Sequence, residues 1–319
     1  MITPSFCSGC GFPLRGYLDA VEDNLSGEFF SISRCPACGL GHTSPVPENL
    51  EPYYGERYYG NRHGFTASYC TARRMRLVAR ASPSGPSGDT RQPRRMLDIG
   101  CGEGTFLLEA QRRGWEVYGA EINPAPAREA GLNVARSIEE LASFAPFACI
   151  TLWHSLEHIS DPRAALGKLR GLLAPGGAIL VAVPDAGGLH AALFGRHWFP
   201  LDVPRHIHHF NRQSLTRMLA DSGLSVTDNA HQEIEYDLYS FNMSLLKTFM
   251  KRPVDCFEFL IGRPRRVSRL RMGMAVLLSA ALAPITLAMT FLGSLARRGG
   301  TLILISQVPA ASPAPSGGQ

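Results

Sequence analysis

The stretch from residue 94 to residue 107 constrains the fold of this chain more than any other. An apolar run is interrupted by glycines at positions 100, 102 and 104, and an apolar pattern with helical spacing resumes at Phe106. Glycine is favoured where the backbone needs a positive φ or must lie close to a ligand. We therefore predict a strand, a tight turn and the start of a helix, arranged so that the turn can bind a ligand.

A second predicted strand, residues 115–122, supports this interpretation. It contains an acidic residue, Glu121, about 20 residues after Gly100, where a Rossmann-like βαβ unit places the acid that binds a ribose diol. A dinucleotide-binding fingerprint would need glycine at position 105, and the chain has Thr105 there. A nicotinamide-dependent oxidoreductase therefore remains only as an alternative.

These features resemble those of the class I S-adenosylmethionine-dependent methyltransferases, over residues 94–236 and, with a final strand, to 308. The resemblance implies that the glycine turn, Asp98 and Phe106 hold the methionine part of the cofactor and that Glu121 binds the ribose. Ser137 and Ile138 would lie beside the adenine, and His154 would line the sulfonium pocket. The cofactor-binding residues expected in this way are Asp98, Gly100, Cys101, Gly102, Gly104, Phe106, Glu121, Ile122, Ser137, Ile138, Trp153 and His154.

The pattern that follows the turn predicts an open, mostly parallel α/β sheet. Strands are expected at residues 132–135, 147–153, 178–183 and 224–228, with helices at 106–113, 123–129, 162–173 and 211–219 between them. A further helix should start at Ser137 as N-cap, and residues 301–308 should add a last, antiparallel strand. The expected fold class is α/β, a Rossmann-like seven-stranded methyltransferase sheet with a small N-terminal zinc ribbon and an apolar helical insertion before the last strand.

Two cysteine pairs near the N-terminus predict a structural metal site. Cys7 and Cys10, like Cys35 and Cys38, form a C-x-x-C-G unit, and each unit can place two thiolates on one tetrahedral zinc ion. Residues 17–33 between them can form a hairpin. A redox C-x-x-C motif would need only one pair, so structural Zn²⁺ is the stronger interpretation. The other cysteines are isolated and read as buried apolar residues.

Length and composition set the domain organisation. The chain has 319 residues and 45% hydrophobic residues, enough for a packed core in about two domains. We expect a zinc ribbon at 1–50, an aromatic and helical connector with a Pro/Ser/Gly linker at 51–93, and a methyltransferase domain at 94–308. Residues 237–300 would be its helical, possible membrane-contacting insertion, and 309–319 a disordered tail. Two Tyr-Tyr-Gly units in the connector could stack on a ligand, although packing of the ribbon is the simpler role.

Charge and the N-terminal residues narrow the partners and the compartment. A formal net charge of +5 is too small to argue for nucleic acid. No basic stretch followed by an apolar run opens the sequence, so no secretory signal is expected and eight cysteines indicate a reducing cytoplasm. A nucleic-acid methyltransferase is a further alternative, weakened by the lack of an N/D-P-P-Y/F stretch after Trp153.

Two histidine-rich stretches follow predicted strands, where the ligand should lie. Residues 154–158 (HSLEH) resemble a stretch of ubiquinone-type O-methyltransferases, in which an E-x-x-E-H cluster is associated with a divalent metal. His154, Glu157 and His158 could therefore bind a metal softer than magnesium. The expected catalytic residues are His206, His158 and Glu157, because histidine titrates near neutrality and is the commonest general base.

The second stretch, residues 201–210, resembles bacterial methyltransferases of polysaccharide and sugar-nucleotide pathways. Sugar C-methyltransferases also carry a four-cysteine module and an E-H-x-x-x-F stretch, which His206 and Phe210 match. Arg205 stands where the acid would be, so C-methylation is an alternative and a sugar, glycan or other small-molecule hydroxyl is the expected acceptor. The alternative from another class is a binding protein with a zinc ribbon and a relic methyltransferase domain. The simplest role for these histidines is to pack a lid over the site.

Residues 272–295 contain no charged side chain and are long enough to cross a membrane. Pro284 should divide them into two helical segments, and arginines flank both ends. If residues 301–308 complete the sheet, one crossing is impossible, so a hairpin at the inner face of the membrane would be needed. Membrane contact through 263–298, a buried lid over the site and a dimer surface all remain open.

Overall fold

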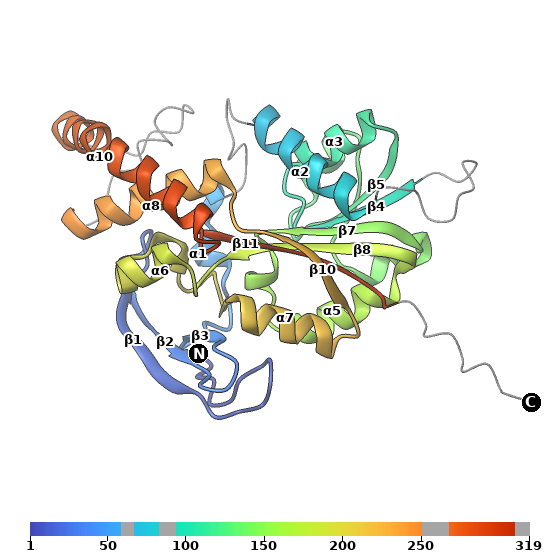
Figure 1. Ribbon diagram of the computed structural model, residues 1–319, viewed down its shortest axis with the longest axis horizontal. Helices are drawn as coiled ribbons and strands as arrows, with labels where there is room; N and C mark the ends of the chain where they lie inside the picture. The colour runs from blue at the N-terminus through green and yellow to red at the C-terminus, as the bar shows by residue number, and fades with distance from the viewer. Residues whose placement is uncertain (59–66, 83–93, 251–267, 310–319) are drawn as a thin grey trace, which may run out of the picture.

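The computed structural model describes residues 1–58, 67–82, 94–250 and 268–309, and Figure 1 shows how their helices and strands are arranged. The Pro/Ser/Gly part of the connector expected at 51–93 lies largely outside the described residues, as do Tyr59 and residues 310–319 of the expected tail. The described helices are α1 Glu51–Tyr58, α2 Ala67–Ala81, α3 Thr105–Arg112, α4 Ala125–Glu129, α5 Pro162–Gly171, α6 Leu189–Phe194, α7 Arg212–Asp221, α8 Ile234–Phe249 and α10 Arg269–Leu295.

A seven-stranded sheet forms the centre of the molecule and confirms the predicted fold class. Its strand order is β10-β11-β8-β7-β4-β5-β6. Neighbours from β8 to β6 are parallel, whereas β11 is antiparallel to both β8 and β10. The strands are β4 Arg94–Ile99, β5 Trp115–Ala120, β6 Asn133–Ala135, β7 Phe147–Trp153, β8 Leu173–Pro184, β10 Ser225–Ala230 and β11 Thr301–Gln307.

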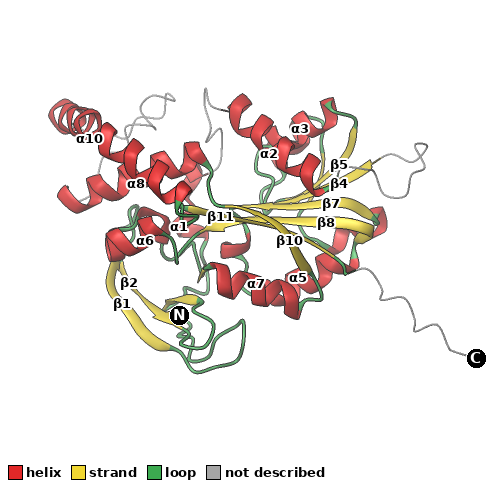
Figure 2. Cartoon of the chain, viewed as in Figure 1, coloured by secondary structure: helices red, strands yellow, loops and turns green. Residues whose placement is uncertain are grey.

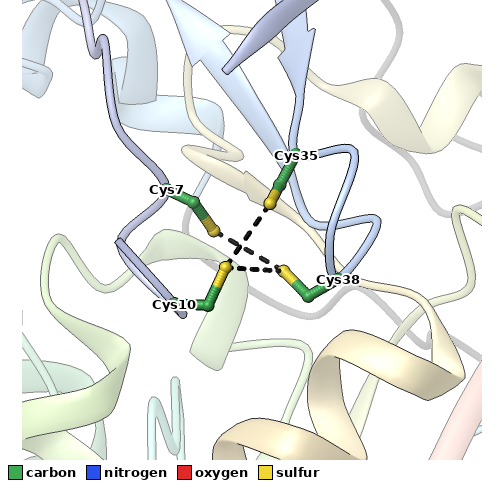
Figure 3. Close-up of side chains that lie close together, drawn as sticks. All are labelled: Cys7, Cys10, Cys35 and Cys38. Carbon is green, nitrogen blue, oxygen red and sulfur yellow. Dashed lines mark hydrogen bonds between the residues drawn. The ribbon is translucent and has the colours of Figure 1, made fainter. Parts of the chain in front are cut away.

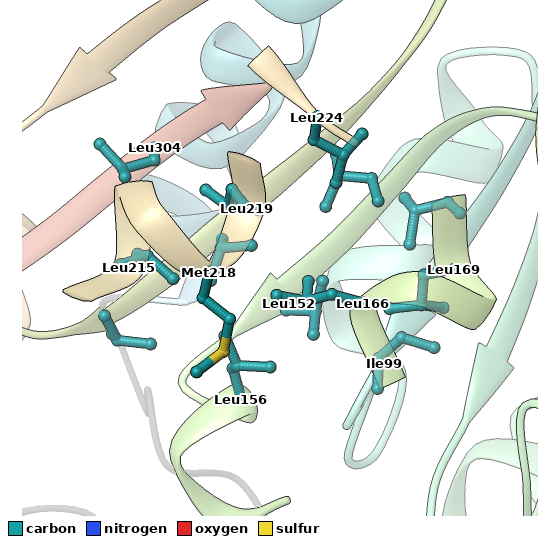
Figure 4. Packing of buried hydrophobic residues seen from close by; sticks show 14 of the residues in the cluster. Ile99, Leu152, Leu156, Leu166, Leu169, Leu215, Met218, Leu219, Leu224 and Leu304 are labelled. Atoms are coloured by element: carbon teal, nitrogen blue, oxygen red, sulfur yellow. The ribbon is translucent and has the colours of Figure 1, made fainter. Parts of the chain in front are cut away.

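Helices cover both faces of this sheet, as Figure 2 shows with α2 and α3 on one side and α5 and α7 on the other. Successive residues of the central strands alternate between two hydrophobic clusters because side chains along a strand point to opposite faces. Leu97 packs with α5 and α7, and its neighbour Met96 packs with α2 and α3. Figure 4 shows the first cluster, in which Leu152 and Leu166 lie between strand and helix. Burial on both faces explains why β7 is apolar throughout.

The N-terminal sheet consists of β1 Arg15–Glu22, β2 Phe29–Arg34, β3 Gly41–Ser44 and β9 His208–His209, in the order β1-β2-β3-β9. The antiparallel pairing of β1 with β2 confirms the hairpin expected between the cysteine pairs. The fourth strand comes from the second histidine stretch, since Gly41 and His42 pair with His209 and His208. No local pattern indicated that these two histidines would complete the ribbon.

The insertion before the last strand forms α8 and α10, which pack against each other and project from one end of the sheet (Figure 1). The prediction that Pro284 divides the apolar stretch is wrong, because α10 runs without interruption from Arg269 to Leu295. Proline removes the hydrogen bond from its own nitrogen and crowds the carbonyl four residues earlier, but the Ala- and Leu-rich sequence around it favours helix strongly enough to continue.

Two smaller predictions also differ from the structure. The helix expected to start at Ser137 is a 3₁₀ helix from Glu139 to Phe144, and the Ser137 hydroxyl donates to the Glu140 carboxylate instead of capping it. The helix expected to reach residue 173 ends at Gly171, and the Pro-Gly-Gly segment after it already belongs to β8. Both differences arise at element ends, where local sequence constrains structure least.

Candidate active site

The glycine turn between β4 and α3 lies at the carboxyl end of the central strand. Gly100, Gly102 and Gly104 have φ values of 75°, 56° and 81°, in the left-handed region that favours glycine. A Cβ on Gly100 would come within 2.7 Å of the Ser155 side chain, so this glycine permits the turn to pack under the end of β7. A Cβ on Gly102 would meet no protein atom within 4 Å, so this part of the turn faces open space.

Glu121 lies at the neighbouring strand end and contacts the turn directly. Its Oε2 accepts a hydrogen bond of 2.9 Å from the Gly102 backbone nitrogen. The next residue, Ile122, is apolar and 75% exposed, which leaves a surface that a planar base can cover. Ser137 and Ile138 are half-buried just after β6, the strand beside β5. A turn, an acid and an apolar surface at adjacent strand ends fit a nucleoside-containing cofactor.

The remaining residues expected at the cofactor lie deeper. Phe106 and Trp153 are buried and meet edge to face, with ring centroids 5.7 Å apart. Asp98 is buried and accepts a hydrogen bond of 2.6 Å from the Thr151 hydroxyl, and burial raises the pKa of its carboxyl to about 7. The Cys101 thiol packs against Gly119 in β5, so its side chain points into the core.

His154, at the end of β7, belongs to a network that the sequence did not reveal. Its Nε2 lies 2.6 Å from Oε2 of Glu233. The other oxygen of that carboxylate, Oε1, accepts hydrogen bonds from Arg73 and Arg74. Burial alone would lower the pKa of His154, but the carboxylates of Glu157 and Glu233 raise it to about 9. The ring is therefore cationic at neutral pH and is held between acids from two parts of the chain.

Glu233 and Arg74 take part in this network, but no local sequence motif predicts it. Glu233 is 1% exposed, directly before α8, and Arg74 lies on α2 with its guanidinium 4.9 Å from the centre of the Trp153 ring. Both residues occur in sequence stretches without a recognisable pattern. Only the folded chain brings them to the end of β7.

Glu157, His158 and His206 form a second cluster at this edge of the sheet. One ligand atom from each lies within 4.8 Å of the others, and the His158 and His206 rings meet edge to face at 4.7 Å. Glu157 is 1% exposed, and neither of its carboxylate oxygens has a hydrogen-bond partner. It faces His154 and His206 at 3.7 and 3.9 Å. The sequence pointed to His154 as the third member of this cluster, but the structure places His206 there.

Backbone carbonyls fix how the two imidazoles are protonated when neutral. His206 Nδ1 lies 2.8 Å from the Pro200 oxygen, and His158 Nδ1 lies 3.0 Å from the Arg205 oxygen. A carbonyl only accepts, so each Nδ1 carries the hydrogen and each Nε2 keeps its lone pair. Burial, followed by the charge of His206, lowers the pKa of His158 to about 4, so this ring is neutral at pH 7.

The Glu157 carboxyl is ionised, although burial alone would raise its pKa. The His154 imidazole, cationic at neutral pH with its Nδ1 3.7 Å away, is the main cause that lowers that pKa below its usual range. Two imidazole nitrogens and a carboxylate therefore turn acceptor atoms toward one another. Such a cluster favours a proton or a cation between its members.

Arg205, at the position where the resemblance to sugar C-methyltransferases implies an acid, has a structural role. It is 1% exposed and binds Asp23 of the ribbon at 2.7 Å and Asp202 at 2.5 Å. These contacts connect the ribbon to the loop that carries His206. The guanidinium is therefore occupied and does not replace a catalytic acid.

The four cysteine sulfurs of the ribbon converge, as Figure 3 shows. Cys7 and Cys38 lie 3.6 Å apart, Cys10 and Cys35 3.5 Å apart, and Cys10 and Cys38 3.7 Å apart, sulfur to sulfur. Four thiolates about 2.3 Å from a tetrahedral zinc ion would be about 3.8 Å from one another. The donor set and its spacing therefore fit Zn²⁺. The ion would join the two C-x-x-C-G units and have no open coordination position.

Comparison with known proteins agrees with this geometry. A family model described as "Methyltransferase domain" matches residues 64–229, more than half of the chain. The ubiquinone biosynthesis O-methyltransferase of Xanthomonas euvesicatoria pv. vesicatoria is 29% identical over 154 residues, which are 42% of this chain and 64% of that protein. The corresponding protein of Xanthomonas axonopodis pv. citri is 28% identical over 172 residues, 48% and 68% of the two chains. The chain thus spans less than two thirds of the first of these relatives.

A solved structure shows the same fold over most of the chain. It is phosphoethanolamine N-methyltransferase 2 of Haemonchus contortus, 14% identical, with a TM-score of 0.52 over 94% of this chain and 69% of that one. At this identity the likeness concerns the fold alone. The sheet order, the glycine turn with its acid and the match to the family together give the conclusion: this chain belongs to the methyltransferase domain family.

Proposed function

We propose that the enzyme methylates a hydroxyl oxygen of a small-molecule acceptor and that the cluster of Glu157, His158 and His206 takes up the proton of that hydroxyl. The observation that carries the proposal is the buried, unpartnered carboxylate of Glu157 beside two imidazoles whose Nε2 atoms are acceptors. A hydroxyl placed among these atoms can donate its hydrogen to the cluster, which makes its oxygen more nucleophilic.

We also propose which residues hold the cofactor. Gly102 and Glu121 would contact the ribose region, Ile122 would cover the adenine, and Trp153 and Phe106 would form the apolar wall behind the methionine part. When bound, S-adenosylmethionine supplies an electrophilic methyl group on a sulfonium. The protein aligns the acceptor oxygen with that methyl group and excludes water, because the transfer is an in-line displacement.

The position of the cluster supports this arrangement. Glu157 and His158 follow β7 within five residues of Trp153. Ser155, which lies between Trp153 and Glu157 in the sequence, packs against Gly100 of the turn. His206 reaches the same place from the loop held by Arg205. Acceptor binding would therefore occur beside the turn, at the carboxyl end of the sheet.

Oxygen is the favoured methylated atom because the curated relatives are named O-methyltransferases. A sugar, a lipid-linked glycan or another hydroxyl-bearing intermediate remains the proposed acceptor class. Sugar C-methylation is the less favoured alternative, since Arg205 is engaged with Asp23 and Asp202.

A divalent cation is the second candidate occupant of the cluster. The donor set of two histidines and one carboxylate, each histidine with its Nδ1–H on a backbone carbonyl, is common among sites for zinc, iron and manganese. Glu157, His158 and His206 would hold such an ion, which would lower the pKa of a bound hydroxyl. Metal content is measured for the purified wild-type protein and for His206→Asn. An ion that the variant loses belongs to this cluster, and an ion that it keeps belongs to the cysteine site.

The proposed function is tested by methyl incorporation from radiolabelled S-adenosylmethionine into lipid and polar extracts of bacterial cells. Wild-type protein should label a hydroxyl compound, identified by mass spectrometry, and His206→Asn should reduce its rate by about a hundredfold or more. His190→Asn is the matched control, because His190 is equally buried but packs on Phe241 of α8. An unchanged rate in His206→Asn, or a methyl group found on carbon or nitrogen, would contradict the proposal.

A further inference from the structure

The exposed side of α10 is the largest feature that methyl transfer does not explain. Only 17% of its most apolar 18-residue window is buried inside the protein. Its buried positions are small or short, such as Ala275 and Gly293, and the helix packs against α8. The large apolar side chains point outward, including Leu277 at 73% and Phe291 at 67% exposure. An apolar surface of this extent marks an interaction site.

The charged residues of this helix and its flanks lie only at its two ends. Arg269 and Arg271 lie in its first turn, Arg297 and Arg298 follow its last turn, and no charged residue lies between them. The helix contains no acidic residue. An apolar surface with cations at both ends is complementary to the interface of an anionic bilayer, where acyl chains lie beside phosphate groups.

The arginines after α10 also line a pocket of about 250 Å³. Arg212, at the start of α7, and His231 line the same pocket. His231 lines the pocket with these arginines, and burial, followed by the charges of Arg212 and Arg297, lowers its pKa. The acid of this pocket, Asp185, is itself buried and accepts from the Gly187 nitrogen. Exposed guanidiniums from two helix ends therefore surround a space that fits a phosphate.

A second copy of the chain suits this surface poorly. Two α10 helices packed in parallel would place arginine ends beside identical arginine ends. Packed antiparallel, Arg269 and Arg271 would lie beside Arg297 and Arg298 of the other copy. Both arrangements bring like charges together, whereas a phospholipid surface neutralises them at both ends.

The topology excludes a single crossing of the bilayer by α10. Strand β11 follows the helix and is hydrogen-bonded to β10 and β8, which precede it. One crossing would place bonded strands on opposite sides of the membrane. A helix that lies along the surface, with its exposed side among the acyl chains and its arginines at the level of the phosphates, keeps the bonded strands on one side.

We propose that the exposed side of α10, together with the pocket of Arg212, Arg297 and Arg298, docks the enzyme onto an anionic phospholipid membrane. The pocket holds a headgroup phosphate, and the apolar side chains enter the outer part of the acyl layer. This inference does not depend on the identity of the acceptor, since it rests on surface composition and topology alone.

The test is co-sedimentation of the full-length, zinc-loaded protein with vesicles of phosphatidylcholine alone or with added phosphatidylglycerol. The protein should sediment with the anionic vesicles, bind neutral vesicles much more weakly, and lose part of its binding at high salt. Leu277→Gln with Phe291→Gln should weaken binding about tenfold, while glutamine preserves helix propensity. Phe29→Gln, at a ribbon position 64% exposed, should leave binding unchanged.

The electrostatic part has its own matched pair of variants. Arg297→Gln with Arg298→Gln should weaken binding to anionic vesicles about tenfold. Arg112→Gln with Arg113→Gln removes the same charge from the surface of α3 and should have little effect. The proposal is overturned if wild-type protein does not sediment with anionic vesicles, or if both arginine pairs weaken binding equally. A dimer in solution that Leu277→Gln and Phe291→Gln disrupt, with vesicle binding unchanged, would assign the surface to a second copy instead.

Discussion

The imidazole Nε2 of His154 lies 2.6 Å from Oε2 of Glu233, and this contact joins the end of β7 to the residue that precedes α8. The same carboxylate also binds Arg73 and Arg74 of α2. Three segments of the chain, far apart in sequence, therefore meet at one buried acid beside the cofactor turn.

Glu233→Gln should lower the free energy of unfolding by about 3 kcal/mol, because it leaves buried cations without their counter-charge. Urea unfolding followed by circular dichroism measures the loss. Asp228→Asn is the control, since Asp228 pairs with Arg80 at the surface and an exposed pair is worth about 1 kcal/mol or less. Equal effects from the two variants would show that the buried network adds no stability.

Gly102→Ala should weaken binding of S-adenosylmethionine at least about tenfold, because the added methyl group would occupy the space beside Glu121 that the cofactor needs. Isothermal calorimetry measures the affinity. Gly114→Ala has a similar positive φ and equally open surroundings, at the end of α3. Both variants should lose similar stability, about 1–2 kcal/mol, but only Gly102→Ala should lose affinity. Unchanged affinity in Gly102→Ala would remove this glycine from the cofactor site.

Removal of zinc should destabilise the ribbon. Elemental analysis should find one zinc ion in the wild-type chain and in Cys149→Ala, and none in Cys35→Ser, because Cys149 is an isolated buried residue of β7. A strong chelator should lower the Tm of the wild type toward that of Cys35→Ser. A metal-free wild type with the same Tm as the chelated sample would reject the zinc site.

Asp237 should make stability depend on pH between about 4 and 7. Burial raises the pKa of its carboxyl to about 7, against the influence of the Thr301 hydroxyl, so the folded chain keeps a proton that the unfolded chain has released. The stabilisation from this group is full below its unfolded pKa and is lost as pH rises through about 7. Asp237→Asn should therefore gain stability relative to wild type as pH rises.

Urea midpoints of the two proteins at pH 5 and pH 8 test this prediction. A difference between them that stays constant would mean that Asp237 titrates alike in the folded and unfolded chains. Thr301→Val is a companion variant, since it removes the hydroxyl that donates to Asp237 and should move the pH dependence further upward.

Local patterns were sufficient to predict much of the fold. The apolar run from Phe147 to Trp153 coincides with β7, and the positive-φ glycines coincide with the turn, because both signals depend on neighbouring residues alone. The helices expected to begin at 162 and 211 begin within one residue of those positions, where Asp161 and Asn211 are the N-caps of α5 and α7.

Long-range contacts could not be predicted in this way. Glu233 meets His154 only when α8 folds back on the sheet. His206 joins Glu157 and His158 from a loop that Arg205 connects to the ribbon. The path of α10 through Pro284 depends on the balance between one lost hydrogen bond and a strongly helical sequence. Such balances do not appear as motifs.

The pairing of β9 with β3 has a consequence for synthesis of the chain. Gly41 and His42 leave the ribosome long before His208 and His209, their partners in the ribbon sheet. The two C-x-x-C-G units can fold first, but the edge of β3 stays unpaired until strands β4 to β8 and residues 208–209 have been translated. Metal capture near the start of the chain and closure of the histidine loop are thus separated by the synthesis of more than 150 residues. An N-terminal fragment ending at residue 50 would expose an open strand edge.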